Sequence, residues 1–484
     1  MVHLRTAIRS PLLSFAAGLL GLLAFGLFSS EEGPGPQHAA AEAPESSMLA
    51  HSLREFTAKR ALPEERPAPR VLFEPGEDAP PGLPIALEDL NGRSMEHFHK
   101  ALDRAKRGEG KARLVFYGAS HTAADLFTGV LRESLQERYG DGGPGFVLPV
   151  HPWRSYRHHQ LTIESNGDEW KTHRISAPPN VLDHYGLAGA AMEASEIGSY
   201  GRIVSRTRGL GSQIGRFELF YMNQPEGGSF EVLIDDESVG IVSTRADERS
   251  AGFAEFTVPE GPHRFEIRIV KEGPVRIFGV AAESEGPGVV LDTLGINGSR
   301  VRNHLLWEEN LYRLHLSKRE PDLVVLAYGT NESGDDQPLS QYEAELHQVL
   351  ARIRETVPEA SCLLIGPSDR PVPLDRERTA FEDRPRTHEL IEIQWRASMM
   401  HGCAFFDMVA FQGGPLSMVA WNELDPPYAA PDHIHFRRRG YERFGEILLG
   451  ALLENAPGEE APTPLEGDEI RHAKSSVEDK RGEE

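Results

Sequence analysis

Ser120 is the residue whose type and position first suggest chemistry. It ends the stretch LVFYGAS (residues 114–120), in which an apolar run stops at a glycine. Apolar residues then recur three and four positions apart, as in a helix: Ala123, Leu126, Phe127, Val130, Leu131 and Leu135. A strand leading into a helix places the serine at the carboxyl end of a sheet, where open α/β sheets bind ligands. We therefore predict that Ser120 is a nucleophile; its alternative role is that of a helix cap.

Asp432 and His435 can activate such a serine. They stand three residues apart in PDHIHF (residues 431–436). A serine is a weak nucleophile until a base takes its proton, and a carboxylate can orient the imidazole that does so. The pattern predicts a serine hydrolase with its triad in the order Ser, Asp, His. The alternative is a capping aspartate beside surface histidines.

Two further turns offer hydrogen-bond donors. Asn331 lies in AYGTNE (residues 327–332), directly after the strongly apolar run 321–328, and Gly298 lies in DTLGINGS (residues 292–299). Acyl transfer needs donors aimed at the developing oxyanion, and a glycine lets the backbone approach a ligand closely. Either turn taken alone is also compatible with an ordinary loop.

The four segments, in this order, resemble the SGNH (GDSL-type) hydrolase family. That resemblance implies that Ser120 is the nucleophile, His435 its base and Asp432 the residue that orients the base. It also implies an oxyanion hole made by the backbone N–H of Ser120 together with Gly298 and Asn331, and no cofactor or metal.

Two positions depart from the family pattern. The first block usually reads Gly-Asp-Ser, and here Ala119 replaces the aspartate; Glu332 stands where the third block often has aspartate. Neither residue is the proton acceptor, so the triad is retained. Ala119 nevertheless bears on how the neighbouring loops are positioned.

The elements that must position these residues fall into two α/β parts. Residues 114–147 and 290–450 alternate apolar strands with amphipathic helices, which predicts a flavodoxin-like parallel sheet with helices on both faces. We expect strands at 321–328, 361–366 and 404–407 and helices at 94–107, 341–354, 387–400 and 440–453. Between the two parts, residues 150–288 read as short alternating strands separated by turns, which predicts an inserted antiparallel β-sandwich. The hydrolase domain would then comprise residues 67–149 and 289–455.

The ends of the chain differ in composition from the rest. Arg5 and Arg9 precede an uncharged stretch, so residues 1–28 are predicted to be a signal peptide or a membrane anchor through residues 11–28. Residues 29–66 read as a disordered linker and residues 456–484 as a disordered acidic tail. These features predict an exported protein, periplasmic or in the cell envelope, with an inner-membrane tether as one alternative.

Composition and charge narrow the classes of partner. The 484 residues carry a formal net charge of -23, which argues against nucleic-acid binding. The two cysteines, Cys362 and Cys403, lie in apolar runs and form no CxxC motif. That placement favours buried thiols, with a disulfide between neighbouring strands as the alternative.

The layout with an inserted β-domain is similar to the peptidoglycan O-acetylesterase branch of the family. The resulting hypothesis is an exported esterase that removes a small acyl group, with acetyl favoured, from a carbohydrate such as peptidoglycan. The alternatives are a lipase or thioesterase acting on acyl chains, an acyltransferase, and a catalytically weakened protein that binds cell-wall glycan.

Overall fold

The computed structural model describes residues 62–76, 79–178 and 181–457, and these residues belong to one compact unit. The predicted segment 1–28, residues 29–61 of the predicted linker 29–66 and residues 458–484 of the predicted tail 456–484 lie outside the described residues. No helix in the described part of the chain is long and apolar enough to cross a membrane.

A five-stranded parallel sheet forms the centre of the hydrolase part, in the order β13-β1-β14-β15-β18. The strands are β13 (Gly288–Gly295), β1 (Lys111–Gly118), β14 (Leu323–Ala327), β15 (Ser361–Ile365) and β18 (Ala404–Phe406). Their residues alternate between two buried apolar clusters, as the pleat of a sheet with both faces covered requires. The predicted parallel α/β fold is therefore confirmed.

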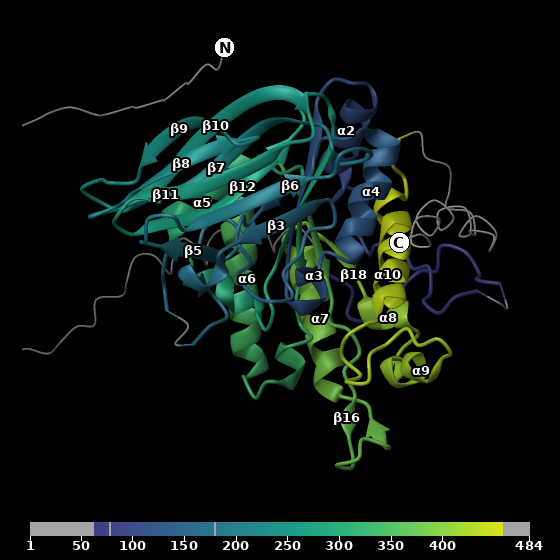
Figure 1. The fold of residues 1–484 in the computed structure, drawn as a ribbon. Coiled ribbons are helices and arrows are strands. Elements are labelled where there is room, and N and C mark those ends of the chain that lie inside the picture. Colours follow the sequence, from purple (N-terminus) through teal and green to yellow (C-terminus); the bar gives the residue numbers. More distant parts are fainter. Residues whose placement is uncertain (1–61, 77–78, 179–180, 458–484) are drawn as a thin grey trace, which may run out of the picture. The chain divides into compact units, whose positions relative to one another are not determined.

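Helices cover both faces of this sheet. On one side lie α2 (Glu96–Lys106), α4 (Phe127–Tyr139) and α10 (Arg438–Leu453), which run beside one another in Figure 1. On the other side lie α5 (Glu309–Arg319), α6 (Leu339–Thr356) and α7 (Pro385–Met400). Two short helices, α8 (Met408–Gln412) and α9 (Ser417–Glu423), and a small hairpin of β16 (Val372–Pro373) and β17 (Phe381–Glu382) complete the carboxyl-terminal part.

The predicted continuous helix after Ser120 is interrupted. A short helix α3 (Ser120–Ala123) is followed by Asp125 with a φ of 49°, and α4 begins only at Phe127. The Asp125 carboxylate accepts hydrogen bonds from the buried Arg132 and from Thr293 on β13. These tertiary bonds stabilise a left-handed residue where the local apolar pattern predicted helix.

Residues 150–288 form two antiparallel sheets, as predicted, and one of these sheets also includes residues 145–147, which were predicted to lie in the first α/β part. One has the order β10-β7-β12-β5-β4, with β2 also paired to β12, and the other has the order β3-β6-β11-β8-β9. Phe217 of β7 stacks on Phe265 of β11 at a ring distance of 4.9 Å, so the sheets pack face to face. The strands are β2 (Gly145–Val147), β3 (Leu161–Ser165), β4 (Lys171–Arg174), β5 (Ala190–Ala194), β6 (Tyr200–Ser205), β7 (Ile214–Asn223), β8 (Ser229–Ile234), β9 (Glu237–Ser243), β10 (Ser250–Gly261), β11 (Arg264–Lys271) and β12 (Val275–Glu283).

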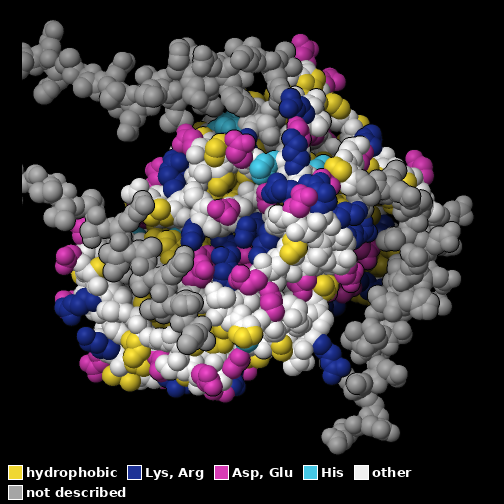
Figure 2. All heavy atoms as spheres, turned by 90° about the horizontal axis from the view of Figure 1, so that it is seen from above, with side chains coloured by type: hydrophobic (Ala, Val, Ile, Leu, Met, Phe, Trp, Pro, Cys, Tyr) yellow, Lys and Arg dark blue, Asp and Glu magenta, His cyan; other side chains and the backbone are white. Residues whose placement is uncertain are grey.

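Buried charges join the β-sandwich to the hydrolase sheet. Arg319 at the end of α5 donates to Asp292 on β13 and to Glu283 on β12, and all three side chains are almost fully buried. Burial raises the pKa of Glu283, but the positive charges of Arg319 and Arg113 lower it by more. The pKa of this carboxyl therefore lies well below its usual value. Figure 2 shows a face of the molecule on which Lys and Arg side chains gather with Asp and Glu among them.

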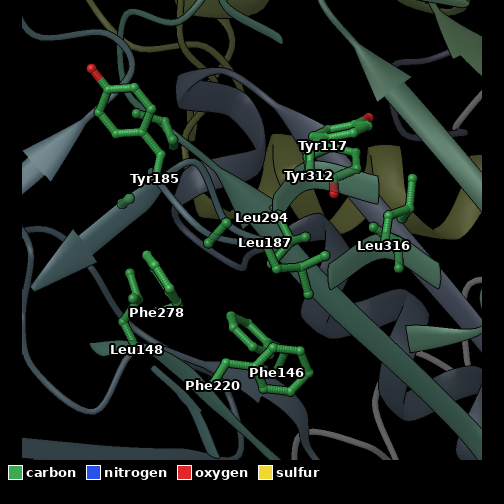
Figure 3. Packing of buried hydrophobic residues seen from close by; sticks show 14 of the residues in the cluster. Tyr117, Phe146, Leu148, Tyr185, Leu187, Phe220, Phe278, Leu294, Tyr312 and Leu316 are labelled. Carbon is green, nitrogen blue, oxygen red and sulfur yellow. The ribbon is translucent and has the colours of Figure 1, made fainter. Parts of the chain in front are cut away.

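Apolar side chains continue the same junction. Figure 3 shows Tyr117 of β1 and Leu294 of β13 together with Phe146, Phe220 and Phe278 of the sandwich. All of these side chains are buried and belong to one cluster. Since the two parts share a core, the sandwich is fixed against the sheet that carries Ser120.

Cys362 and Cys403 form a disulfide, with their Cα atoms 4.5 Å apart. The favoured prediction of buried thiols is therefore wrong, and the alternative of a disulfide holds. Parallel pairing of β15 with β18 brings the two residues together, and that register could not be read from the apolar runs alone.

Candidate active site

Ser120 lies at the carboxyl end of β1, where the chain turns into α3. The turn is tight: a Cβ at Gly118 would lie 2.1 Å from Thr122 Oγ1, so only glycine fits at that position. The carbonyl of Ala119 accepts the N–H groups of Thr122 and Ala123. This geometry brings the Ser120 hydroxyl to the edge of the sheet, as the sequence pattern predicted.

His435 lies directly against that hydroxyl. Its Nε2 is 2.8 Å from Ser120 Oγ, and its Nδ1 is 2.7 Å from Asp432 Oδ2. With Asp432 ionised, Nδ1 carries the hydrogen and donates it to the carboxylate. Nε2 is then free to accept the serine proton, which is the geometry that a general base requires.

The Asp432 carboxylate is fixed by its own loop. Its Oδ1 accepts the backbone N–H groups of Ile434 and His435, each at 3.0 Å. Burial raises the pKa of Asp432, but these bonds and the bond from the His435 ring outweigh it and lower the pKa below its usual value. Asp432 therefore stays ionised over the range in which an esterase works.

The predicted oxyanion residues lie on two adjacent loops. The Asn331 side-chain Nδ2 donates to the carbonyl of Ser299 at 2.9 Å, which ties the Asn331 turn to the Gly298 loop. Gly298 has a φ of 75°, a conformation that favours glycine, and a Cβ there would meet open space. An amide carries two N–H bonds, so one hydrogen of Asn331 remains available for a substrate oxygen.

Glu332 explains how the two loops keep their relative position. One of its carboxylate oxygens accepts the N–H of Val301 at 2.8 Å and the other accepts the N–H of Gly329 at 3.0 Å. The side chain is buried, and burial raises its pKa although the backbone bonds oppose this. The longer acid at this position thus spans the gap between the loops.

The Gly298 loop is bonded to the turn at Ser120 although position 119 has no aspartate. The Gly118 carbonyl accepts the backbone N–H of Ile296 at 2.9 Å and the hydroxyl of Ser299 at 3.1 Å. These two bonds connect the nucleophile turn to the oxyanion loop through the backbone. Ala119 itself is buried, and its side chain carries no polar group.

Sequence reasoning missed several residues that contact this site. His121, adjacent to the nucleophile, is buried with both ring nitrogens hydrogen-bonded. Arg300, Arg370 and Arg378 donate to the carbonyls of Gly298, Asn331 and Asp432, respectively. His121 could have been singled out from the sequence because it directly follows Ser120. The three arginines lie in other segments and form no recognisable sequence pattern. Within the described residues no group of three or more His, Cys, Asp or Glu side chains is arranged to hold a metal.

Comparison with known proteins supports the same assignment. Residues 273–443 match the model of the GDSL-like Lipase/Acylhydrolase family, a stretch that contains Gly298, Asn331, Asp432 and His435. This stretch of the chain is similar to the SGNH (GDSL-type) hydrolases. With the Ser120, His435 and Asp432 geometry described above, the chain is an ester-bond hydrolase.

One solved structure shares the fold of most of this chain. A structure titled "Peptidoglycan O-acetylesterase in action" matches with a TM-score of 0.64 and 24% identity, covering 77% of this chain and 99% of that chain. A family two carbohydrate esterase from Cellvibrio japonicus matches at 11% identity over 61% of this chain and 97% of that one, with a TM-score of only 0.25. No curated protein matches the sequence.

Proposed function

We propose that this SGNH hydrolase removes a small acyl group, acetyl above all, from a carbohydrate of the cell envelope such as peptidoglycan. The observation that carries the proposal is the 2.8 Å contact between Ser120 Oγ and His435 Nε2, with Asp432 on the far side of the imidazole. Serine, base and orienting carboxylate together are what acyl transfer through a covalent intermediate needs.

The reaction follows from the positions of these groups. Ser120 Oγ bonds to the acyl carbon while His435 Nε2 takes its proton, and the carbonyl oxygen becomes an oxyanion. The N–H groups of Ser120, Gly298 and Asn331 donate to that oxyanion. His435 then gives the proton to the sugar oxygen, which leaves as a hydroxyl. Water, deprotonated by His435, attacks the acyl-enzyme, and its proton returns to Ser120 as the carboxylic acid departs.

The exposure of the site supports a small acyl group on a large substrate. The side chains of His435 and Asp432 are 37% and 44% exposed, so the triad lies at an open surface. Two hollows among the described residues, of about 470 and 280 Å³, are lined by other residues. An open site admits a polymer, whereas a long acyl chain would need an apolar channel.

The β-sandwich supports a carbohydrate as that polymer. Its first loop reaches the oxyanion side of the site, where Ser155 Oγ lies 3.4 Å from Asn297 Nδ2, next to Gly298. The fold is also that of a protein whose title names peptidoglycan O-acetylesterase activity. Export through residues 1–28, with 29–66 as a linker, 67–149 and 289–455 as the hydrolase domain and 456–484 as a tail, belongs to the same proposal.

The test is hydrolysis of p-nitrophenyl acetate by the full-length protein, beside Ser120→Ala and His435→Ala. Each substitution should lower kcat by about 10⁴-fold or more, because the triad acts as a unit. Ser243→Ala, on the exposed strand β9, should retain full activity. Undiminished turnover in Ser120→Ala would overturn the assignment of the nucleophile.

A second measurement addresses the substrate. The acetyl ester should be hydrolysed faster than p-nitrophenyl esters of eight or more carbons, and acetate should be released from O-acetylated peptidoglycan. Preference for the long chains would instead identify a lipase. Activity on acetyl esters without release from peptidoglycan would contradict peptidoglycan as the substrate, and transfer of acetyl to an added glycan would identify a transferase.

A further inference from the structure

His121 is buried at the point where the catalytic segments meet. Its side chain follows that of Ser120 on α3, is only 6% exposed, and has its ring centre 5.5 Å from that of His435. The ring also packs against Phe436, at 5.3 Å. The mechanism above uses no atom of His121, so its burial beside the base calls for a different explanation.

Both ring nitrogens of His121 have partners. Nδ1 lies 3.1 Å from the hydroxyl of Tyr441 on α10, and Nε2 lies 3.1 Å from the hydroxyl of Ser368. A tyrosine hydroxyl has one hydrogen to donate, and we assign that hydrogen to Nδ1 of His121. Nε2 then carries the ring hydrogen and donates it to Ser368.

The chain of bonds continues to the oxyanion side. Ser368 Oγ lies 3.1 Å from Thr330 Oγ1, and the Ser368 backbone N–H donates to the same oxygen at 3.0 Å. Thr330 immediately precedes Asn331. Through these bonds, the imidazole connects α3 with the Asn331 turn on one side and with the helix that follows His435 on the other.

We propose that His121 is a positioning residue, whose neutral ring accepts from Tyr441 and donates to Ser368 and so holds nucleophile, base loop and oxyanion turn in register. This rests on the proposed function of Ser120, His435 and Asn331. A neutral ring is needed because one nitrogen must accept. Burial, with repulsion from His435, lowers the pKa of His121 to about 3, so the ring stays neutral at working pH.

The test compares His121→Phe with His121→Gln, using p-nitrophenyl acetate. Phenylalanine fills the space but makes neither bond, so we expect kcat to fall about 10- to 100-fold with KM unchanged. Glutamine retains a donor and an acceptor and should recover part of that loss. Equal kcat in both variants and the parent would overturn the proposal.

A double-mutant cycle makes the test independent of one substitution. Ser368→Ala breaks the chain at the next bond, so it should lower kcat as well. The double variant should be no slower than His121→Phe alone, because both changes remove one connected path. If the fold-loss in kcat of the double variant equals the product of the two single losses, the two residues act separately. That result would also overturn the proposal even if His121→Phe folds poorly.

His315 provides the matched control. It is also fully buried, among Phe220, Phe253 and Phe278, and neither ring nitrogen has a hydrogen-bond partner in the described part of the chain. His315→Leu should keep the parent kcat. If Ser120→Ala is inactive and the His121 variants match the parent, only the positioning role fails; if Ser120→Ala is active, the proposed function itself fails.

Discussion

Asn331, the proposed oxyanion donor, also has a structural role through its side chain. One of its two N–H bonds is committed to the Ser299 carbonyl at 2.9 Å. That bond fixes the amide plane, and so determines the direction in which the second hydrogen points. A donor that is already oriented needs no reorganisation when the oxyanion forms, which is why such groups contribute strongly to rate.

Replacement of Asn331 by Ala should therefore lower kcat by about 10²–10³-fold while KM changes little. Asn331→Asp should be at least as slow, because a carboxylate accepts hydrogen bonds only and repels the oxyanion. Steady-state kinetics with p-nitrophenyl acetate measures both. Asn223→Ala, on β7 of the sandwich, is the matched control; a loss in the control equal to that at Asn331 would contradict an oxyanion role.

Among the elements, the β16–β17 hairpin stands out because it projects from the rest of the hydrolase part (Figure 1). Phe381 of β17 lies 4.4 Å, ring to ring, from His433, and Arg378 donates to the Asp432 carbonyl. His433 has a φ of 55°, a conformation that is unfavourable for a residue with a Cβ. The hairpin thus packs against the strained part of the base loop.

We expect Phe381→Ala to lower kcat about tenfold or more, because the loop that carries Asp432 and His435 loses its packing partner and small displacements are costly. Thermal unfolding of the same variant should change little, since the hairpin adds little to the core. Leu374→Ala, in the same hairpin with its side chain 59% exposed, is the control. Equal activity of both variants would show that the hairpin does not position the loop.

The elements also show what sequence patterns predict and what they cannot. Residues 321–328 and 361–366 were predicted as strands because a sheet covered on both faces leaves continuous apolar runs. The break at Asp125 was missed because its cause is tertiary: Arg132 and Thr293 hold the carboxylate, while the local spacing remains helical. The Cys362–Cys403 bond likewise depends on strand register.

The candidate site divides in the same way. The pairing of Ser120 with His435, 315 positions apart, was predicted from the order of short motifs. The path from His121 through Ser368 to Thr330 was not, since single serines and threonines have no distinctive spacing. Motifs reveal groups that react, whereas the groups that position them become visible only in the fold.

Across the whole molecule, buried histidines make stability depend on pH. Burial lowers the pKa of four of them to about 3: His121, His158, His304 and His315. In the unfolded chain these groups regain an ordinary pKa near 6.5. Between pH 6.5 and 3 the unfolded state therefore binds protons that the folded state does not, and acidification favours unfolding.

Each such histidine can lower the free energy of unfolding by up to about 1.4 kcal/mol for every pH unit below 6.5. We therefore expect Tm to fall steadily from pH 7 to pH 4.5, as measured by thermal unfolding followed by circular dichroism. Surface charge acts in the opposite direction. As the pH falls toward the pI of 5.4, the net charge of -23 becomes smaller and the repulsion between surface charges weakens. Added salt screens the surface term and leaves the buried term, so the fall in Tm should persist at high salt.

His315→Leu separates the buried histidines from other causes of acid unfolding. Leucine removes a ring that lacks hydrogen-bond partners among the described residues, and it removes one group that takes up a proton on unfolding. The variant should therefore match or exceed the parent in Tm at pH 7 and lose less Tm on acidification. Parallel Tm profiles for the two proteins would mean that His315 takes up no proton on unfolding in this range, because its pKa in the folded protein is not lowered. The acid sensitivity would then have to come from carboxylates such as Glu283, whose lowered pKa makes their stabilisation disappear only below their ordinary pKa, near pH 4.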